Sequence, residues 1–452
     1  MNRPEPTVAS PHAVAKASIL DTLAVMKDVV IPTLAKGPLI RRRKVVTVAE
    51  RAGLDDKAVK RMQALRKKYG PGPLLLAIPV RAQGVILSAD DAQMILKGSP
   101  EPFAAASLEK QAALNHFQPE SVLASHGEPR AKRRVLNEAT LETDCPAHSK
   151  AAHFAAIADE EMAEVSAKAR AYGTLDWDTF FVGWFRMIRR IVLGDAARED
   201  HELTDLLEKL RRRGNNAFLN RKDRKTRAAF LSRLKTYVDD PDPASLAGQM
   251  AASCKDPQQM PERQLPQFLF AFDPAGMASF RTLALLSVHP EAEARVRAEM
   301  RDNPGPAPQL DFLRMCYMES LRLWPTTPAI LRETTRDVQW GTGVVPKNTQ
   351  LLIFAPFLHR DDEQLEQAHR FDPSLWADGN ERPDLGLMPF SHGPVVCPAI
   401  RFVPPVATYA LRALLTRMEL RVNQPERLPP DRLPGTLDPY TLDFTARPLA
   451  AG

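Results

Sequence analysis

The stretch FSHGPVVCPAIRF, residues 390–402, carries the cysteine around which the rest of the chain is organised. Cys397 follows a Gly/Pro turn and precedes an apolar segment, residues 409–418, that is expected to be helical. Backbone N–H groups of a turn and the N-terminus of a helix both favour a charged sulfur, so the pattern predicts a lowered pKa for the Cys397 thiol. A buried structural cysteine explains the same stretch equally well, since free cysteine is among the most buried residue types.

Two other stretches precede this cysteine along the chain. Glu319 and Arg322 lie in a helical pattern over residues 311–324, and their i, i+3 spacing places them on one face where they can pair. Such pairs are common on solvated helices, so this pair is informative only in combination with the motifs downstream of it. Residues 368–376 then read AHRFDPSLW, and the cysteine stretch comes next.

The order and spacing of these motifs resemble the cytochrome P-450 family of haem-thiolate monooxygenases, from about residue 67 to the C-terminus. The resemblance implies that Cys397 is the axial thiolate ligand of a b-type haem and that Phe390 lies at the haem. It also implies that Glu319, Arg322 and Arg370 lock the region behind the haem. Electron donation from such a thiolate favours O–O cleavage.

The resemblance predicts one large, mainly α domain with a small β region (α+β). The expected catalytic domain spans residues 39–452, after a partly flexible N-terminal lead, residues 1–38, with a candidate amphipathic helix over residues 13–30. Residues 99–125 are expected to be irregular and to roof the substrate pocket. Further helices are predicted at residues 62–69, 151–170, 177–193, 205–213, 223–238 and 262–288, and strands at residues 74–79 and 84–88.

Whole-chain composition narrows the function classes. An apolar fraction of 44% and a charged fraction of 26% are ordinary for a globular protein with a sizeable core. No run of eighteen apolar residues is present, the first eleven residues lack a signal-peptide layout, and the four cysteines show no paired spacing, so a soluble cytoplasmic protein is expected. Aromatic residues are not interleaved with the basic clusters, which argues against nucleic-acid binding. Those clusters are expected to be solvated faces or to steer an acidic electron-transfer partner.

Three arginines are candidates for binding the haem propionates. Arg130 and Arg134 lie one helical turn apart, and the family places a His or Trp and an Arg at this spacing. Two guanidinium groups so placed suit bidentate carboxylate binding, although an exposed basic helix face would have the same pattern. Arg332 matches a third propionate-binding Arg of the family. Val395 stands where the family commonly has another His or Arg. Without that residue, propionate binding is expected to depend more on these three arginines.

The expected oxygen-side helix, residues 262–288, departs from the family pattern. Counting back from His289, the family's Gly falls on Ala271, which is expected at the cofactor, its acid on Asp273, and its Thr on Pro274. In the family the acid and the Thr pass protons to iron-bound dioxygen. Proline has neither a hydroxyl nor an N–H, so it should remove a backbone hydrogen bond and kink the helix. A carboxylate satisfied locally beside a kink is the alternative role for Asp273.

Three mechanisms remain open for such a site. Proton delivery could run through an ordered water or a substrate hydroxyl, with Asp273 as the catalytic relay, and this is the preferred hypothesis. The enzyme could instead use hydrogen peroxide directly. It could also perform coupling, desaturation or rearrangement rather than hydroxylation.

The pocket-lining segments are aliphatic and aromatic, which favours a mostly apolar small molecule, such as a secondary-metabolite intermediate, as the substrate. Electrons are expected from a separate ferredoxin and its reductase, because this length contains no flavin or nicotinamide domain. An auxiliary protein that keeps the fold without catalysis is the competing class, and the presence of Cys397 argues against it. The candidate substrate contacts are Phe103, Leu114, Phe117, Phe272, Ala329 and Ile330.

Overall fold

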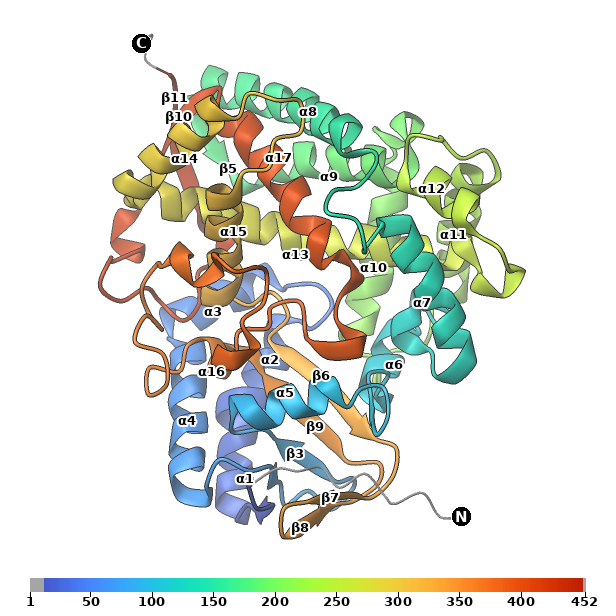
Figure 1. Cartoon of the computed structure of the whole chain (residues 1–452), viewed down its shortest axis with the longest axis vertical. Helices are drawn as coiled ribbons and strands as arrows, with labels where there is room; N and C mark the ends of the chain where they lie inside the picture. The colour runs from blue at the N-terminus through green and yellow to red at the C-terminus, as the bar shows by residue number, and fades with distance from the viewer. Residues whose placement is uncertain (1–11, 450–452) are drawn as a thin grey trace.

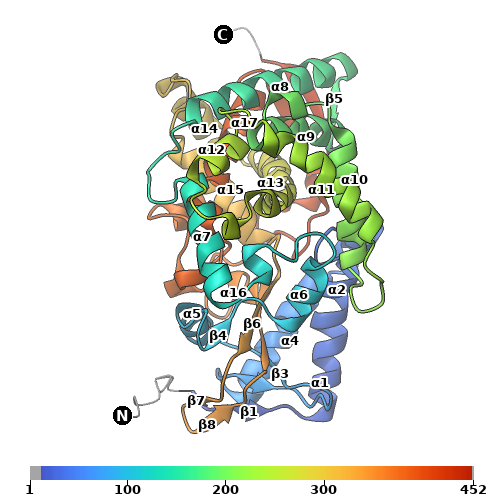
Figure 2. The ribbon, with the colours of Figure 1, turned by 90° about the vertical axis from the view of Figure 1, so that its right-hand side faces the viewer.

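A long helix, α13 (Pro261–Val288), runs through the middle of the molecule, and Figure 2 shows it almost end-on with other helices around it. The computed structural model describes residues 12–449. α13 is buried over most of its surface, as expected of a helix that is apolar nearly all round. The helix continues through Pro266 and Pro274, so the kink predicted at Pro274 does not interrupt it.

Helices make up most of the chain and fill the upper part of Figure 1. The mainly α prediction is therefore confirmed. The helices are α1 (Ile19–Val25), α2 (Ile31–Lys36), α3 (Arg43–Arg51), α4 (Leu54–Tyr69), α5 (Ala89–Lys97), α6 (Leu108–Leu114), α7 (Gly127–Leu141), α8 (Ala151–Tyr172), α9 (Trp177–Leu193), α10 (His201–Gly214), α11 (Arg224–Asp239), α12 (Leu246–Ser253), α13, α14 (Pro290–Asp302), α15 (Asp311–Leu323), α16 (Ala355–His359) and α17 (Val403–Leu415).

The β region is small: its main sheet and the pair β7-β8 lie in the lower part of Figure 1, near α1 and α4, whereas β5, β10 and β11 lie in the upper part. Its main sheet has the order β1-β2-β3-β9-β6-β4, and β6 pairs antiparallel with both β9 and β4. The other sheets have the orders β10-β11-β5 and β7-β8. The strands are β1 (Ala15–Lys16), β2 (Leu74–Leu75), β3 (Gln83–Val85), β4 (Phe103–Ala104), β5 (Thr174–Asp176), β6 (Ala329–Thr334), β7 (Val338–Trp340), β8 (Gly343–Val345), β9 (Gln350–Phe354), β10 (Met418–Val422) and β11 (Asp443–Pro448).

The segment predicted to be an irregular roof, residues 99–125, contains β4 and α6. The side chain of Ser107 accepts a hydrogen bond from the N–H of Lys110 and so caps the start of α6. This local cap explains why a helix forms where the prolines favoured loop. The segment carries Lys110, a cation near Cys397 described below, and Leu114, one of the predicted substrate contacts.

The N-terminal part is more ordered than predicted. Helical structure runs from Ile19 to Lys36 through α1, a π-helical stretch η1 (Met26–Val30) and α2, and it buries Val25 and Val29. Residues 1–11 of the predicted lead lie outside the described residues, and the division at residue 38 stays a prediction. Within residues 12–449, no helix has the length and apolar character needed to cross a membrane.

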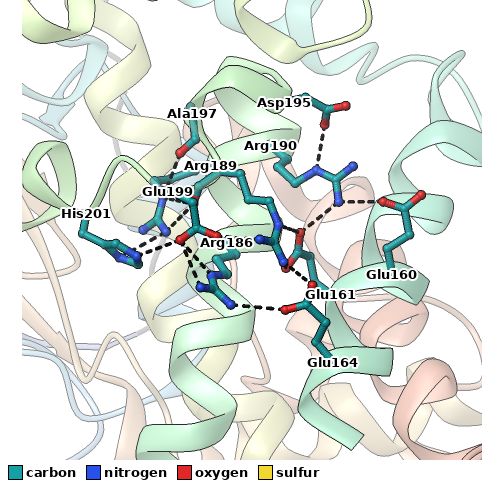
Figure 3. A network of polar contacts seen from close by, with 11 residues as sticks. Glu160, Glu161, Glu164, Arg186, Arg189, Arg190, Asp195, Ala197, Glu199 and His201 are labelled. Carbon is teal, nitrogen blue, oxygen red and sulfur yellow. Dashed lines mark hydrogen bonds and ion pairs between the residues drawn. The ribbon is translucent and has the colours of Figure 1, made fainter. Parts of the chain in front are cut away.

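A charged network connects α8, α9 and the start of α10 (Figure 3). The buried Glu161 of α8 accepts hydrogen bonds from Arg190 of α9 at 2.9 Å and from Arg198, just before α10, at 2.7 Å. Arg189 donates to the carbonyl of Ala197 at 3.0 Å. A buried carboxylate with two guanidinium partners holds three helices in register. These contacts fix the start of α10, and Arg211 lies in the last turn of the same helix.

Candidate functional site

The loop that carries Cys397 is a sequence of tight turns. Gly393 has a φ of +72°, and a Cβ there would lie 2.5 Å from the carbonyl oxygen of Leu96, so glycine is required on both counts. The N–H of Cys397 donates to the carbonyl of Phe390 at 2.8 Å, which closes the loop. A short 3-10 helix, η8 (Pro398–Arg401), follows at once.

The helix after this loop differs from the prediction. The sequence pattern favoured residues 409–418, with Pro404 and Pro405 as an interruption, whereas α17 spans Val403–Leu415. Both prolines lie in its first turn, where no N–H is needed as a donor, so they start the helix instead of breaking it.

The predicted lowering of the Cys397 pKa is wrong for the protein alone. Burial raises the pKa of the Cys397 thiol, and the N–H of Ala399 and the positive charges of Arg134 and Lys110 lower it by less. The turn and the cations act in the predicted direction, but desolvation of the thiolate outweighs them.

One face of α13 is only partly covered by other side chains. Gln267, Phe270, Ala271 and Pro274 are partly exposed although α13 lies in the core, and residues on both sides of this stripe are buried. Their spacing of three, one and three residues places them on a single helix face. Cys397 is also partly exposed while its loop packs against the same core cluster. An apolar helix face that is only partly covered and a partly exposed cysteine in the same core cluster are expected around a flat, apolar cofactor.

The same region holds positive charge without acidic partners among residues 12–449. Burial lowers the pKa of Lys110 to about 7, and the charges of Arg332 and Arg130 lower it further, whereas that of Cys397 raises it, which places Lys110 within electrostatic reach of all three. Burial also lowers the pKa of Arg332 to about 10, followed by the effect of Arg130. Within the described chain, the side chain of Arg332 donates only to Ser99, Ser391 and its neighbouring carbonyl.

Arg130 and Arg134, the other two predicted propionate ligands, behave differently. Nη2 of Arg130 is buried and has no hydrogen-bond partner among residues 12–449, and burial lowers the pKa of this guanidinium. Arg134 instead donates to the carbonyl of Val396 at 2.7 Å and to Glu138 at 2.6 Å. Arg130 is therefore free to bind an anion, while Arg134 supports the cysteine loop. Their binding to haem propionates stays a prediction.

The buried pair behind the loop forms as predicted. Both Glu319 and Arg322 are fully buried, and Nη2 of Arg322 donates to Glu319 at 2.6 Å. Arg322 also donates to the carbonyls of His359 and Ala368. These bonds tie α15 to α16 and to the segment before the cysteine loop.

The role predicted for Arg370 in this lock is wrong. Its half-exposed side chain extends to Glu366 at 3.4 Å, and only its backbone carbonyl receives a bond from Arg322. The third member of the lock is Trp376, whose indole N–H donates to Glu319 at 2.9 Å. A buried indole needs a hydrogen-bond acceptor, and the carboxylate supplies one.

Asp273 is held by an ion pair. Nη2 of Arg211, at the end of α10, donates to its Oδ2 at 2.6 Å, and both side chains are buried. Arg211 also packs over the ring of Phe270, with its guanidinium carbon 4.8 Å from the ring centroid. Oδ1 of Asp273 has no donor among the described side chains and backbone groups. Only Oδ2 of Asp273 is therefore satisfied locally, so the structure supports the alternative of a locally satisfied carboxylate only for one of the two oxygens.

The six predicted substrate contacts do not gather in one place. Phe117 packs edge-on against Phe270, with ring centroids 5.8 Å apart, so it reaches the partly exposed face of α13. Leu114 and Phe272 are buried in the same core cluster, whereas Phe103 packs against Trp340 in the other one. Substrate binding by these residues stays a prediction.

The remaining two contacts lie on β6. Ala329 and Ile330 are neighbours on this strand, so their side chains point to opposite faces of the sheet. Ile330 shares its face with Arg332. The two residues cannot line a pocket from the same face.

Comparison with known proteins accounts for this arrangement. A family model described as Cytochrome P450 matches residues 264–442, which include Asp273, Glu319, Arg332 and Cys397. The retinoic acid-bound cyanobacterial CYP120A1 superposes with a TM-score of 0.70 and 18% identity over 86% of this chain and 94% of that chain. Residues 264–442 therefore match the cytochrome P450 family, and the chain has the P450 fold.

Sequence relatives of this chain match over shorter segments. Cytochrome P450 4c3 of Drosophila melanogaster is 32% identical over 31% of this chain and 28% of its own length. Cyclooctat-9-en-7-ol 5-monooxygenase of Streptomyces melanosporofaciens is 35% identical over 25% of this chain and 27% of its own length. The chain thus spans less than a third of the length of either relative.

P450s hold a b-type haem through a cysteine thiolate, and the residues present fit that group. α13 presents a partly exposed apolar face, Cys397 is partly exposed, and Lys110 lies within electrostatic reach of Cys397, Arg130 and Arg332; the three cations have no acidic partners in the described chain. A thiolate and two propionates supply the negative charge that these cations lack. Cys397 would ligate the iron, and Arg130 and Arg332 would bind the propionates.

The sequence did not reveal three functional residues. Lys110 carried no signal beyond its place in a short polar run, and Arg211 appeared only as part of a basic cluster expected to be solvated. Trp376 lies within the AHRFDPSLW motif, but the resemblance points to the arginine of that motif. The one usable signal was Trp376 itself, a tryptophan in a motif that the resemblance already connects to the Glu319–Arg322 pair.

Proposed function

We propose that this P450 is a haem-thiolate monooxygenase that hydroxylates a mostly apolar small molecule, such as a secondary-metabolite intermediate, in the cytoplasm. The observation that carries the proposal is the partly exposed Cys397 in the same core cluster as the partly exposed apolar face of α13, with the cations Lys110, Arg130 and Arg332, which have no acidic partner within residues 12–449. The haem, when bound, supplies the iron at which an oxidant is activated.

The substrate side of the proposed site is apolar. Phe270, Ala271 and Pro274 present carbon atoms on the exposed stripe of α13, and Phe117 packs beside Phe270. Such a surface binds apolar molecules by excluding water and offers few groups that fix orientation. This supports an apolar substrate and leaves its identity open.

Proton supply runs through Asp273 and water in this proposal. Pro274 lacks an N–H, so the carbonyl of Phe270 loses its helical donor and can accept a hydrogen bond from a water molecule. Arg211 fixes Oδ2 of Asp273 and leaves Oδ1 available to the same water. Asp273 would then hold and pass the proton that a threonine hydroxyl passes in other P450s.

Electrons would come from a ferredoxin and its reductase. Residues 12–449 form the P450 fold and hold no second fold for a flavin or nicotinamide. An external donor of low molecular weight is the simplest supply, and the net charge of +6 favours an acidic one.

Direct use of hydrogen peroxide is the second candidate, and Pro274 favours it because proton delivery to dioxygen is then unnecessary. The test compares product formation from apolar probe compounds in wild type, Asp273→Asn and Pro274→Thr, driven either by dioxygen with a ferredoxin system or by peroxide. The proposal expects dioxygen-driven product in wild type, a loss of about tenfold or more in Asp273→Asn and at least equal yield in Pro274→Thr. Product formation by peroxide alone, unaffected by Asp273→Asn, would establish the second candidate instead.

A further inference from the structure

An exposed apolar line runs along the N-terminal helical segment formed by α1, η1 and α2. Its members are Ile19, Leu20, Leu23, Ile31 and Leu34, and each is more than half exposed, from 51% at Leu34 to 79% at Leu20. Their spacing places them on one side of the segment, opposite the side that packs on the core. A surface helix normally presents polar residues to solvent, so a segment that is apolar on both sides indicates a binding surface. We call these five residues the apolar face.

The charged residues of this segment do not cover the apolar face. Asp21 is paired with Lys68 at 2.7 Å and Asp28 with Arg61 at 2.8 Å, and both cations lie on α4. The two carboxylates are thus neutralised from within the protein. Lys27 is exposed in the middle of the apolar face and has no carboxylate partner among residues 12–449. The exposed side of the segment therefore combines apolar side chains with one uncompensated positive charge.

A second exposed apolar pair lies between α10 and α11, within residues 217–225, which we call the basic loop. Phe218 and Leu219 in it are 71% and 88% exposed. Four exposed basic residues follow them, Arg221, Lys222, Arg224 and Lys225. None of these four forms an ion pair within the described part of the chain, and Asp223 is the one acidic residue of the basic loop. This loop thus repeats the combination of exposed apolar groups and free cations.

The apolar face and the basic loop form one surface. Nη1 of Arg42 donates to the carbonyl of Leu34 at 2.9 Å, and its Nη2 donates to the side chain of Asn216 at 2.8 Å. The side chain of Asn215 accepts the N–H of Leu39 at 2.9 Å, so the end of α10 is tied to the segment after α2. Figure 2 shows α1, α2 and the turn after α10 along the same side of the molecule.

The chemistry of this surface favours one occupant. Apolar side chains on a helix face bind the boundary between headgroups and acyl chains of a bilayer, and basic residues beside them are attracted to anionic lipids. A second copy of this chain would bring the same uncompensated cations against each other, which is unfavourable. The net charge of +6 acts in the same direction.

We propose that the apolar face and the basic loop together bind the surface of an anionic phospholipid bilayer. Residues 19–36 lie in the plane of the headgroups, with the apolar face toward the acyl chains, and the cations of the basic loop contact lipid phosphates. The chain is held on the bilayer surface and does not cross it. This inference goes beyond the proposed function and does not depend on the haem.

The test is co-sedimentation of the purified full chain with two kinds of vesicle, one of phosphatidylcholine alone and one of equal parts phosphatidylcholine and phosphatidylglycerol. We expect wild type to bind the mixed vesicles at least about tenfold more tightly than the neutral ones, and added salt to weaken this binding. Leu20→Ser with Leu23→Ser should weaken it by about tenfold or more, because these side chains leave water on binding. Lys222→Glu with Lys225→Glu should weaken it by a similar factor.

Each double variant has a matched control on α8, which lies at the top of Figure 2. Lys168→Glu with Arg170→Glu changes the net charge by the same amount as the variant of the basic loop. Tyr172→Ser removes an exposed apolar side chain outside the apolar face. Both controls should bind the mixed vesicles as wild type does. All substituted positions are exposed, so every variant should keep the unfolding midpoint of wild type in denaturant.

Equal binding of wild type to both kinds of vesicle, or binding to neither, would overturn the inference. An equal loss of binding in Lys168→Glu with Arg170→Glu would also overturn it, because net charge alone would then explain the binding. A wild type that binds no vesicles and forms a dimer, lost in Leu20→Ser with Leu23→Ser, would show that the apolar face is an interface between two copies of the chain instead.

Discussion

Arg211 on α10 donates a 2.6 Å hydrogen bond to Asp273 on α13, and this ion pair is buried between the two helices. It joins the element anchored by the network of Figure 3 to the helix that forms the wall of the site. Asp273, the proposed proton relay, is thus positioned by Arg211 of α10, 62 residues away along the chain.

Breaking this pair should destabilise the protein. Asp273→Asn leaves the guanidinium of Arg211 buried without its counter-charge, which typically costs about 3–5 kcal/mol. Removing both charges, in Asp273→Asn with Arg211→Met, should cost clearly less than the sum of the two single changes. Denaturant unfolding of the four proteins measures the coupling, with Arg212→Gln as an exposed control within about 0.5 kcal/mol of wild type. Strict additivity would show that the pair contributes nothing.

Trp376, and not Arg370, should matter to the lock behind the haem. Trp376→Phe keeps the aromatic volume but removes the N–H donor to Oε2 of Glu319, which still accepts from Arg322, and a lost hydrogen bond to a charged group costs about 1.5–3 kcal/mol. Arg370→Ala should be close to neutral because its side chain is half exposed. The measurement is the free energy of unfolding of both variants. A large loss in Arg370→Ala with none in Trp376→Phe would return the role to Arg370.

His359 should make the protein sensitive to acid. Burial lowers its pKa to about 3, followed by the charge of Arg322, and its Nε2 accepts the N–H of Met388. As pH falls below the unfolded pKa of about 6.5, the unfolded chain gains a proton that the folded one cannot bind, so stability falls with pH down to about 3. At pH 5 this one group should cost about 2 kcal/mol relative to pH 7.

The matched variant is His359→Gln, which keeps an acceptor for Met388 and does not titrate. Its unfolding free energy should lose less between pH 7 and pH 5 than that of wild type, by about 2 kcal/mol. His126→Gln, at an exposed position, should retain the wild-type acid dependence. Identical pH dependence in wild type and His359→Gln would contradict the prediction.

The cations near Cys397 should set how tightly the haem is held. Arg130→Gln, Arg332→Gln and Lys110→Met each remove a positive charge that lacks an acidic partner in the described chain, so each should speed haem loss to a competing apoprotein by about tenfold. Lys132→Met is the control, because Lys132 pairs on the outside with Glu128 and Asp256. If the three variants release haem at the wild-type rate, these residues do not bind the propionates.

Sequence periodicity predicted the long elements well. The range predicted for α9, residues 177–193, matches the helix at both ends. The range predicted for α13, residues 262–288, starts one residue late and ends correctly. α4 was predicted only from residue 62, because its first turns are rich in charged residues and show little apolar pattern. α17 was misplaced because prolines at a helix start look the same in sequence as prolines that end one.

The site was predictable only where a motif carries it. Cys397, Glu319 and Arg322 could be found because their spacing along the chain is fixed. The partners Arg211 and Trp376 lie 62 and 57 residues from the carboxylates they bind, and no local pattern links them. The pKa of Cys397 was misjudged for a related reason, since desolvation depends on tertiary packing that a turn motif does not contain.

The central claim is that Cys397 ligates a haem iron through its thiolate. The direct measurement is the difference spectrum of the dithionite-reduced protein with carbon monoxide, recorded for wild type, Cys397→Ala and the exposed-cysteine control Cys145→Ala. We predict a strongly red-shifted Soret band in wild type and Cys145→Ala that is absent in Cys397→Ala. A purified wild type without haem, or a red-shifted band that persists in Cys397→Ala, would contradict the account.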